Sequence, residues 1–186
     1  MAYIYNGIVC KLFLLSDELQ LCFVDDQIDT VNDLYDIYQL PNVFKYYSDK
    51  PSICNKRMLK LYLQNQMNAC IRGDILVWNI VRNKKSIGQV QLFDFANCYT
   101  CAQISFFLHP QYWNQGINTT VVMVISEYGF NKLELKRIEA YVYYDNMASF
   151  KSLEKAGFLR EGILRNKYQI DGRIDNCYIY SKIPTN

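Results

Sequence analysis

The chain has 186 residues, of which 51% are hydrophobic, 15% aromatic and 20% charged. This length and composition predict one folded domain over residues 1–186, large enough to bury a sizeable core. The formal net charge is only +2 and no long run of lysine and arginine accompanies it, so nothing indicates a nucleic-acid partner.

Location and metal chemistry can also be addressed from simple patterns. The apolar run 12–15 is bracketed by Lys11 and Asp17 too closely for a signal peptide, and no stretch is long enough to span a bilayer. The seven cysteines are odd in number and scattered, so we expect a cytoplasmic protein without a membrane partner. The closely spaced Cys98 and Cys101 lack a second pair, and the only histidine is His109, so no metal site is expected.

Apolar spacing and turn residues predict a series of strands and helices. The first half of the chain is predicted to form one or two strands within 8–24 with a turn at Ser16-Asp17, a helix from Asp29-Thr30 to Pro41, a helix over 52–72, and strands 75–81 and 87–95 joined by a hairpin. The second half is predicted to form a strand over 102–108, a helix over 118–133, a strand over 137–144, a helix from Asn146 to Gly157, and a hairpin of 158–170 and 173–183. Asp171-Gly172 is a preferred two-residue hairpin turn. The order predicts one α/β (α+β) domain with a mixed sheet.

One turn in this series is suited to bind an anion. It contains Gly116 and leads directly into the helix predicted over 118–133. Free backbone N–H groups and the helix dipole favour a phosphate group at such a place.

Several motifs around this turn occur together in a characteristic order. They are His109-Pro110-x-Tyr112-Trp113-x-Gln115-Gly116, Glu127-Tyr128-x-Phe130, Asp145-Asn146-x-x-Ser149, Leu153-Glu154-Lys155-x-Gly157-Phe158-x-Arg160-Glu161-Gly162-x-x-Arg165, and Asp171-Gly172-Arg173 with Asp175. In this order and spacing the chain resembles, over nearly its whole length, the GNAT acyltransferases of the RimJ/RimL type, which acetylate the N-termini of ribosomal proteins. The resemblance implies the GNAT fold: a mixed, mostly antiparallel seven-stranded sheet with a splayed central parallel pair, and four helices.

The resemblance also implies that acetyl-CoA lies between the strands 102–108 and 137–144. Its pantetheine arm would pair with the backbone of the first of these strands, and its diphosphate would lie on the following turn. The implied cofactor-binding residues are Phe106, Phe107, Leu108, Asn114, Gln115, Gly116, Ile117, Asn118, Thr119 and Asn146. Family turns usually carry glycine or alanine at three places, and here Asn114 and Asn118 take two of them. Asparagine tolerates positive φ, so the turn can still form.

The implied catalytic residues depart from the usual family pattern. Many members have a tyrosine where this chain has Leu153, so Ser149 is the candidate donor to the departing thiolate; the alternative is that it only bonds to the helix backbone. Gln103 replaces a glutamate that can draw a proton from the amine, and can still orient water or substrate. Glu161 is a further candidate on the substrate side, and His109 is expected to be structural.

The pKa of the acceptor amine indicates which chemical class of amine is favoured. At pH 7.4 a lysine-like amine is neutral in about one molecule in a thousand, a penalty of roughly 4 kcal/mol, whereas an α-amino group is only slightly penalised. Without a carboxylate at position 103, a protein or peptide α-amino group or an amino sugar is therefore favoured. A polyamine or antibiotic acetyltransferase, and a non-catalytic acyl-CoA-binding module, remain as alternatives. We expect a monomer or homodimer whose acceptor pocket is lined by residues 25–55 and 160–176.

Overall fold

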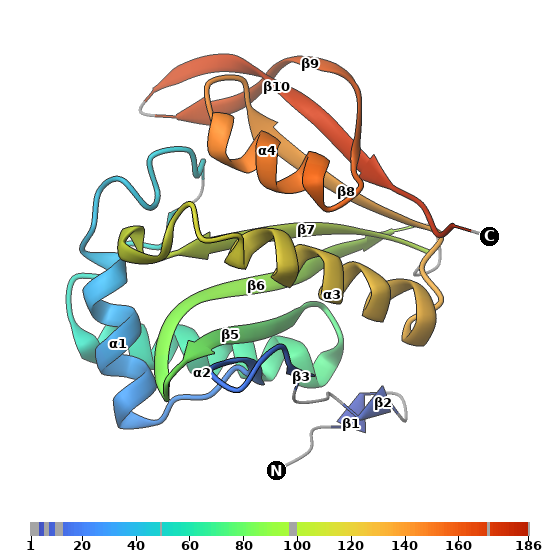
Figure 1. Cartoon of the computed structure of the whole chain (residues 1–186). Coiled ribbons are helices and arrows are strands. Elements are labelled where there is room, and N and C mark those ends of the chain that lie inside the picture. The colour runs from blue at the N-terminus through green and yellow to red at the C-terminus, as the bar shows by residue number, and fades with distance from the viewer. Residues whose placement is uncertain are drawn as a thin grey trace.

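An eight-stranded sheet forms the centre of the molecule (Figure 1). The computed structural model describes residues 4–5, 8–9, 13–48, 50–96, 100–170 and 172–185. In sheet order the strands are β3 (Phe13–Leu14), β4 (Leu19–Phe23), β5 (Leu76–Arg82), β6 (Lys85–Ala96), β7 (Cys101–Leu108), β8 (Arg137–Tyr143), β10 (Arg173–Lys182) and β9 (Leu159–Ile170). The predicted count of seven was one too low, because the two-residue β3 adds an edge strand.

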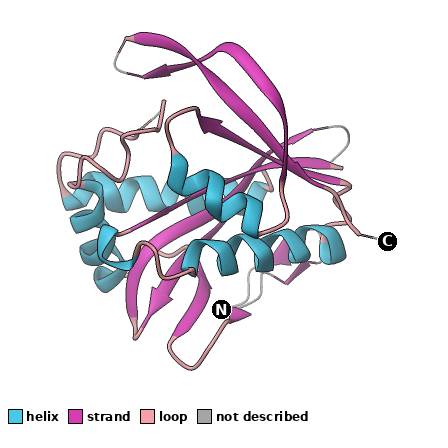
Figure 2. Cartoon of the chain, turned by 45° about the horizontal axis from the view of Figure 1, so that its top comes forward, coloured by secondary structure: helices cyan, strands magenta, loops and turns pink. Residues whose placement is uncertain are grey.

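The helices lie on both faces of this sheet (Figure 2). On one face are α1 (Ile28–Tyr38) and α2 (Lys56–Arg72), and on the other are α3 (Ile117–Lys132) and α4 (Met147–Lys155). A 3₁₀ turn, η1 (Pro110–Tyr112), follows β7, and β1 (Ile4–Tyr5) and β2 (Ile8–Val9) pair only with each other. Within the described ranges, no helix is long and apolar enough to cross a membrane.

Local chemistry accounts for where the helices and turns begin and end. α2 starts later than predicted because Asn55, rather than Ser52, is its N-cap and accepts the N–H of Met58 at 3.0 Å. Gly73 ends it with φ 84°, as its place in the sequence predicted. The β5–β6 turn is shorter than expected, because Asn83 and Lys84 both adopt positive φ and form a two-residue turn.

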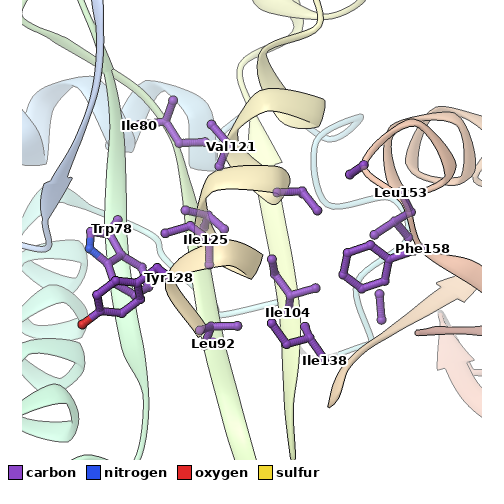
Figure 3. Packing of buried hydrophobic residues seen from close by; sticks show 14 of the residues in the cluster. Trp78, Ile80, Leu92, Ile104, Val121, Ile125, Tyr128, Ile138, Leu153 and Phe158 are labelled. Atoms are coloured by element: carbon purple, nitrogen blue, oxygen red, sulfur yellow. The ribbon is translucent and has the colours of Figure 1, made fainter. Parts of the chain in front are cut away.

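Each face of the sheet has its own apolar core. Figure 3 shows α3 packed on the strands, with Val121 beside Ile80 and Ile125 further along the helix, toward Leu92 and Ile104. On β7 the buried Ala102 and Ile104 belong to this core. Since side chains alternate along a strand, the residues between them point to the α1–α2 face. The polar side chains of β7 are therefore directed away from α3.

The parallel strands β7 and β8 pair only at their beginnings. Their register runs Cys101 to Arg137, Ala102 to Ile138 and Gln103 to Glu139, and stops there. Beyond Gln103 the two strands diverge, which confirms the predicted splayed parallel pair. The divergence leaves the outer edge of β7 unpaired from residue 104 onward, close to the N-termini of α3 and α4.

Candidate active site

Two cavities meet where β7 and β8 diverge. One, of about 610 Å³, is lined by the turn between β7 and α3 and is called the turn cavity below. The other, of about 500 Å³, is lined by tyrosines of β8, β9 and the 43–48 loop and is called the tyrosine cavity. Both volumes suit a small-molecule site. The residues that line both are Tyr46, Tyr47, Phe106, Asn146 and Ser149.

The turn that leads into α3 adopts the conformation required of an anion site. Asn114 has φ 60° and Gly116 has φ 76°, so both take the left-handed conformation that asparagine and glycine tolerate best. The first helical bond runs from Thr120 N–H to the Gly116 carbonyl. The preceding N–H groups of the first turn therefore have no partner within the helix and are available to a ligand.

The residues predicted for this turn do not all face the turn cavity. Its lining includes Asn114, Gly116, Ile117, Asn118 and Thr119. Gln115 is not part of that lining. Its side-chain oxygen instead accepts from Arg82 Nη1 at 2.7 Å, and its amide nitrogen donates to the Gln111 carbonyl at 2.9 Å. Gln115 thus ties the turn to the rest of the protein.

The opposite wall of the turn cavity is basic. Lys151 and Lys155, on successive turns of α4, both line it. Asp145 is the one acidic residue in the lining, so the charged side chains there sum to a single positive charge. Together with the N-terminus of α3, this charge favours an anionic ligand.

The free edge of β7 presents backbone groups to the same space. Phe106 accepts a hydrogen bond from the Tyr47 hydroxyl at 2.9 Å, and Leu108 accepts one from Trp113 Nε1 at 2.7 Å, each through its carbonyl oxygen. The N–H and C=O of one residue in a strand face the same side, so the N–H groups of Phe106 and Leu108 face the gap.

Phe107 does not share this orientation. Its carbonyl points at β6, where a Cβ on Gly88 would lie 2.2 Å from it. Its ring is buried on the other face, 5.6 Å from the ring of Tyr38 between centroids. The backbone carbonyl of Phe107 therefore faces β6 rather than the gap, although Phe107 is among the residues that line the turn cavity.

Asn146 sets the start of α4 as its position in the sequence predicted. Its Oδ1 accepts the N–H of Ser149 at 3.2 Å, which makes Asn146 the N-cap. This bond places Ser149 in the first turn of α4, at the junction of the two cavities. Leu153, one turn later, is fully buried and also lines the tyrosine cavity.

Gln103 reaches the tyrosine cavity. Its Cα lies opposite Phe93 on β6 and Glu139 on β8. Its amide nitrogen donates a hydrogen bond to Oδ2 of Asp94, which lines the same cavity. Sequence motifs do not identify Asp94, because nothing in the local sequence distinguishes it from a surface aspartate.

Glu161 is not among the residues that line either cavity. Its carboxylate forms a bidentate ion pair with the guanidinium of Arg137, with 2.9 Å between Arg137 Nη1 and Glu161 Oε1. It also accepts a hydrogen bond from the Ser181 hydroxyl. These bonds lower the pKa of Glu161 to about 2. A carboxylate held in this way is a poor proton acceptor, so Glu161 is placed as a link between strands and not in the site.

His109 lies at the end of β7, and its side chain has a structural contact. Its Nδ1 accepts the N–H of Gln111 at 3.1 Å and so caps η1. Burial, followed by the charge of Lys85, lowers its pKa. His109 lines neither cavity. The expected structural role agrees with this geometry.

Alternation along the strand predicts that one of Tyr143 and Tyr144 points to the gap, and Tyr143 lines the tyrosine cavity, whereas its other tyrosines carry no such signal in the sequence. Tyr46 stacks on Tyr143 with 5.6 Å between ring centroids, and the Tyr143 hydroxyl donates to Asp175 at 3.0 Å. Tyr141 and Tyr168 complete the wall. These rings come from the loop before α2, from β8 and from β9, which meet only in the folded chain. The segments 25–55 and 160–176, expected beside the acceptor, both contribute to this cavity.

Of the two cysteines in the remaining motif, Cys98 and Cys101, the structure describes only the second. Cys98 lies outside the described residues, and Cys101 begins β7 as a free thiol of intermediate burial. Burial, followed by the charge of Glu139, raises its pKa. Within the described ranges no group of three histidine, cysteine, aspartate or glutamate side chains is arranged to hold a metal ion.

Comparison with protein families gives one match that covers most of the chain. Residues 21–159 match the family model described as "Acetyltransferase (GNAT) domain". "Uncharacterized N-acetyltransferase YoaA" of Bacillus subtilis (strain 168) is 35% identical over 106 residues, which are 56% of this chain and 60% of that protein. The "Spermidine N(1)-acetyltransferase" of Escherichia coli (strain K12) is 24% identical over 148 residues, 78% of this chain and 77% of that protein.

Solved structures share the fold at lower identity. The Microcin C7 self immunity acetyltransferase MccE, in complex with acetyl-CoA and AMP, has a TM-score of 0.83 and 22% identity, covering 91% of this chain and 94% of that chain. RimL, the ribosomal L7/L12 alpha-N-protein acetyltransferase, in complex with coenzyme A, has a TM-score of 0.83 and 16% identity, covering 93% and 98%. At these identities the likeness concerns the fold.

Proposed function

This chain belongs to the acetyltransferase (GNAT) domain family, and from that premise we propose that it is an acetyl-CoA-dependent N-acetyltransferase acting on a primary amine. One observation carries the proposal. The turn cavity and the tyrosine cavity meet at the splayed strands, with Phe106 and Ser149 lining both. An acyl donor in one cavity and an amine in the other could therefore react directly at the junction.

The turn cavity fits acetyl-CoA in charge and in shape. The N–H groups at the start of α3 would hold the diphosphate, and Lys151 and Lys155 add positive charge opposite them. The N–H groups of Phe106 and Leu108 that face the gap would pair with the pantetheine amides along the free edge of β7. Asn114 and Gly116 allow the backbone to approach the phosphates through their positive φ.

In the proposed reaction the amine nitrogen attacks the thioester carbonyl carbon in a ternary complex. A C–N bond forms, the nitrogen releases one proton to solvent or a base, the C–S bond breaks, and the coenzyme leaves as a thiol. Backbone N–H groups on the β7 edge would stabilise the negative charge on the carbonyl oxygen. Ser149 would donate its hydroxyl proton to the departing sulfur and regain one from solvent, since the N-cap Asn146 holds it at the junction.

The acceptor is proposed to have a readily deprotonated amine, with a protein or peptide α-amino group or an amino sugar favoured. At neutral pH an α-amino group is neutral in a far larger fraction of molecules than a lysine-like amine, so it needs little help to lose its proton. A polyamine is the second candidate, because the E. coli relative carries that activity in its name. The aromatic tyrosine cavity suits either class.

Turnover across a panel of amines tests the proposal. Release of coenzyme A would be measured with peptides bearing free N-termini, amino sugars, aminoglycosides and spermidine. We expect saturable release with at least one α-amino peptide or amino sugar. Preference for spermidine would favour the second candidate. Stabilisation of the fold by acetyl-CoA without turnover of any amine would contradict catalysis and identify a non-catalytic acyl-CoA-binding protein.

A further inference from the structure

The tyrosine cavity contains a carboxylate beside the uncharged Gln103. Asp94 of β6 lines the cavity and accepts a hydrogen bond from the Gln103 amide nitrogen. Glutamine and glutamate have the same shape, so a glutamate at position 103 would place an oxygen where this nitrogen lies. The negative charge that Gln103 lacks is therefore present one hydrogen bond away, on the neighbouring strand.

A β-bulge directs Asp94 to this position. Along the β6–β7 ladder Phe93 lies opposite Gln103, and the next pair is Ala96 with Cys101, so two residues of β6 face one residue of β7. Asp94 has φ 52°, a conformation that aspartate tolerates better than most side chains. Bulges bend a strand and redirect a side chain, and they are common beside active sites.

The neighbouring carboxylate of Glu139 is engaged elsewhere. Glu139 accepts from Arg137 Nε at 2.6 Å and from the Tyr141 hydroxyl at 3.0 Å, so both of its oxygens are bonded. Burial, followed by the hydrogen bond to Glu139, raises the pKa of Tyr141 to about 12, so the Tyr141 hydroxyl stays neutral.

Lys167 of β9 also lines the cavity, and the Cys101 thiol lies close enough for Asp94 to raise its pKa slightly. Burial is the main cause of the raised pKa of Cys101, and a thiol with a raised pKa stays protonated at neutral pH. Asp94 itself is exposed, so water can reach its carboxylate and carry a proton away.

Resting on the proposed N-acetyltransferase activity, we propose that Asp94 is the proton acceptor of the reaction. As the amine nitrogen forms its bond to the acetyl carbon, its proton passes, directly or through a water bound beside the hydrogen-bonded pair of Gln103 and Asp94, to the Asp94 carboxylate. The C–S bond breaks, sulfur takes the proton donated by Ser149, and Asp94 returns its proton to solvent while Ser149 regains one. One proton leaves nitrogen and one reaches sulfur, so the exchange balances.

Two variants of nearly identical shape test this role. D94N keeps the side-chain size, the capacity to bond with Gln103 and the tolerance of positive φ, but removes the charge. The double variant D94N/Q103E exchanges the amide and the carboxylate between the two strands and restores one negative charge at the same pair. Steady-state kinetics with the best amine of the panel would be measured from pH 6.5 to 9.5, with melting temperature as the control for folding.

We expect D94N to lower kcat about 100-fold at pH 7, by the usual size of acid–base effects, with a smaller loss at pH 9.5 where hydroxide can take the proton. D94N/Q103E should recover kcat to within about tenfold of wild type. If D94N kept the wild-type kcat, or if both variants lost kcat with an unchanged melting temperature, the role of Asp94 would be overturned. The proposed acetyltransferase function would still stand. Absence of turnover by the wild-type chain would overturn the proposed function and this inference with it.

Discussion

At the residue scale, two hydrogen bonds position the polar residues proposed for catalysis, one at the start of α4 and one between neighbouring strands. The Asn146 cap presents Ser149 to both cavities, and the Asp94 bond presents Gln103 to one of them. Leu153, which the family comparison marks as a lost tyrosine, is buried and apolar and offers no proton. Among the residues predicted for catalysis, Ser149 therefore stays the proposed donor to the leaving sulfur.

Replacing Ser149 tests that position. We expect Ser149→Ala to lower kcat about 100-fold while the KM for acetyl-CoA changes less than about threefold, because the hydroxyl acts on the transition state and not on binding. Ser149→Thr keeps a hydroxyl and should retain most of the activity. An unchanged kcat in Ser149→Ala would show that this serine serves only the helix.

The ion pair of Glu161 predicts a pH effect on stability. Arg137 and Ser181 lower its pKa to about 2 from 4.5, so the stabilisation is complete above about 4.5 and is lost as the pH falls through about 2. Because 44% of the Glu161 side chain is exposed, solvent screening limits the effect to about 1 kcal/mol or less. We expect Glu161→Gln to melt earlier than wild type at pH 7 and equally at pH 2.

Kinetics of the same variant separate a structural role from a catalytic one. Glu161 lies outside both cavities, so Glu161→Gln should keep kcat within about twofold of wild type. A loss of kcat of a hundred times or more would return Glu161 to the proton-transfer chemistry.

At the scale of elements, the junction of β7, the following turn and α3 decides how a cofactor could bind. The free edge of β7 runs directly into the turn, and the turn into the N-terminus of α3. A ligand that follows the strand edge would therefore reach the positive end of the helix dipole without a break. The turn depends on positive φ at Gly116, where a methyl group would meet no protein atom within 4 Å.

Two glycine variants isolate the contribution of this turn. Gly116 and Gly172 have φ 76° and 77°, and a Cβ on either would meet open space. Each change to alanine should cost about 1 kcal/mol of unfolding free energy, because alanine is strained in this conformation. Only Gly116→Ala should raise the KM for acetyl-CoA, by about tenfold, since its methyl group would enter the turn cavity. Equal KM values for the two variants would place the cofactor elsewhere.

On the scale of the whole molecule, a continuous sheet joins the segments that line the two cavities. The strands from β3 to β9 are paired in one series, and residues distant in sequence, such as Tyr46 and Tyr143, stack beside the diverging strands. Opening either cavity would therefore disturb the packing on one face of the sheet. The single domain over residues 1–186 stays a prediction, which unfolding experiments can address.

Unfolding should be cooperative and linked to acetyl-CoA. A ligand at 100 times its Kd stabilises a protein by about 2.7 kcal/mol, which for a domain of this size raises Tm by about 5–10 °C. We expect one thermal transition by circular dichroism, shifted upward by acetyl-CoA and by no more than about 1 °C by the same concentration of AMP. Two separate transitions would contradict a single domain, and a missing shift would contradict the proposed cofactor.

Sequence patterns determined the elements and the turn before α3, whereas the residues proposed for proton transfer are brought together only by the tertiary structure. Helix caps, glycine stops and apolar periodicity act within a few residues, so Asn146, Gly73 and Gly116 could be assigned correctly. Asp94 and the tyrosine cavity could not be assigned, because a bulge in one strand and rings from three segments act only after the sheet has formed. For the same reason Glu161 matched a family motif yet faces Arg137: the pairing across β8, β10 and β9 determines which way its carboxylate points.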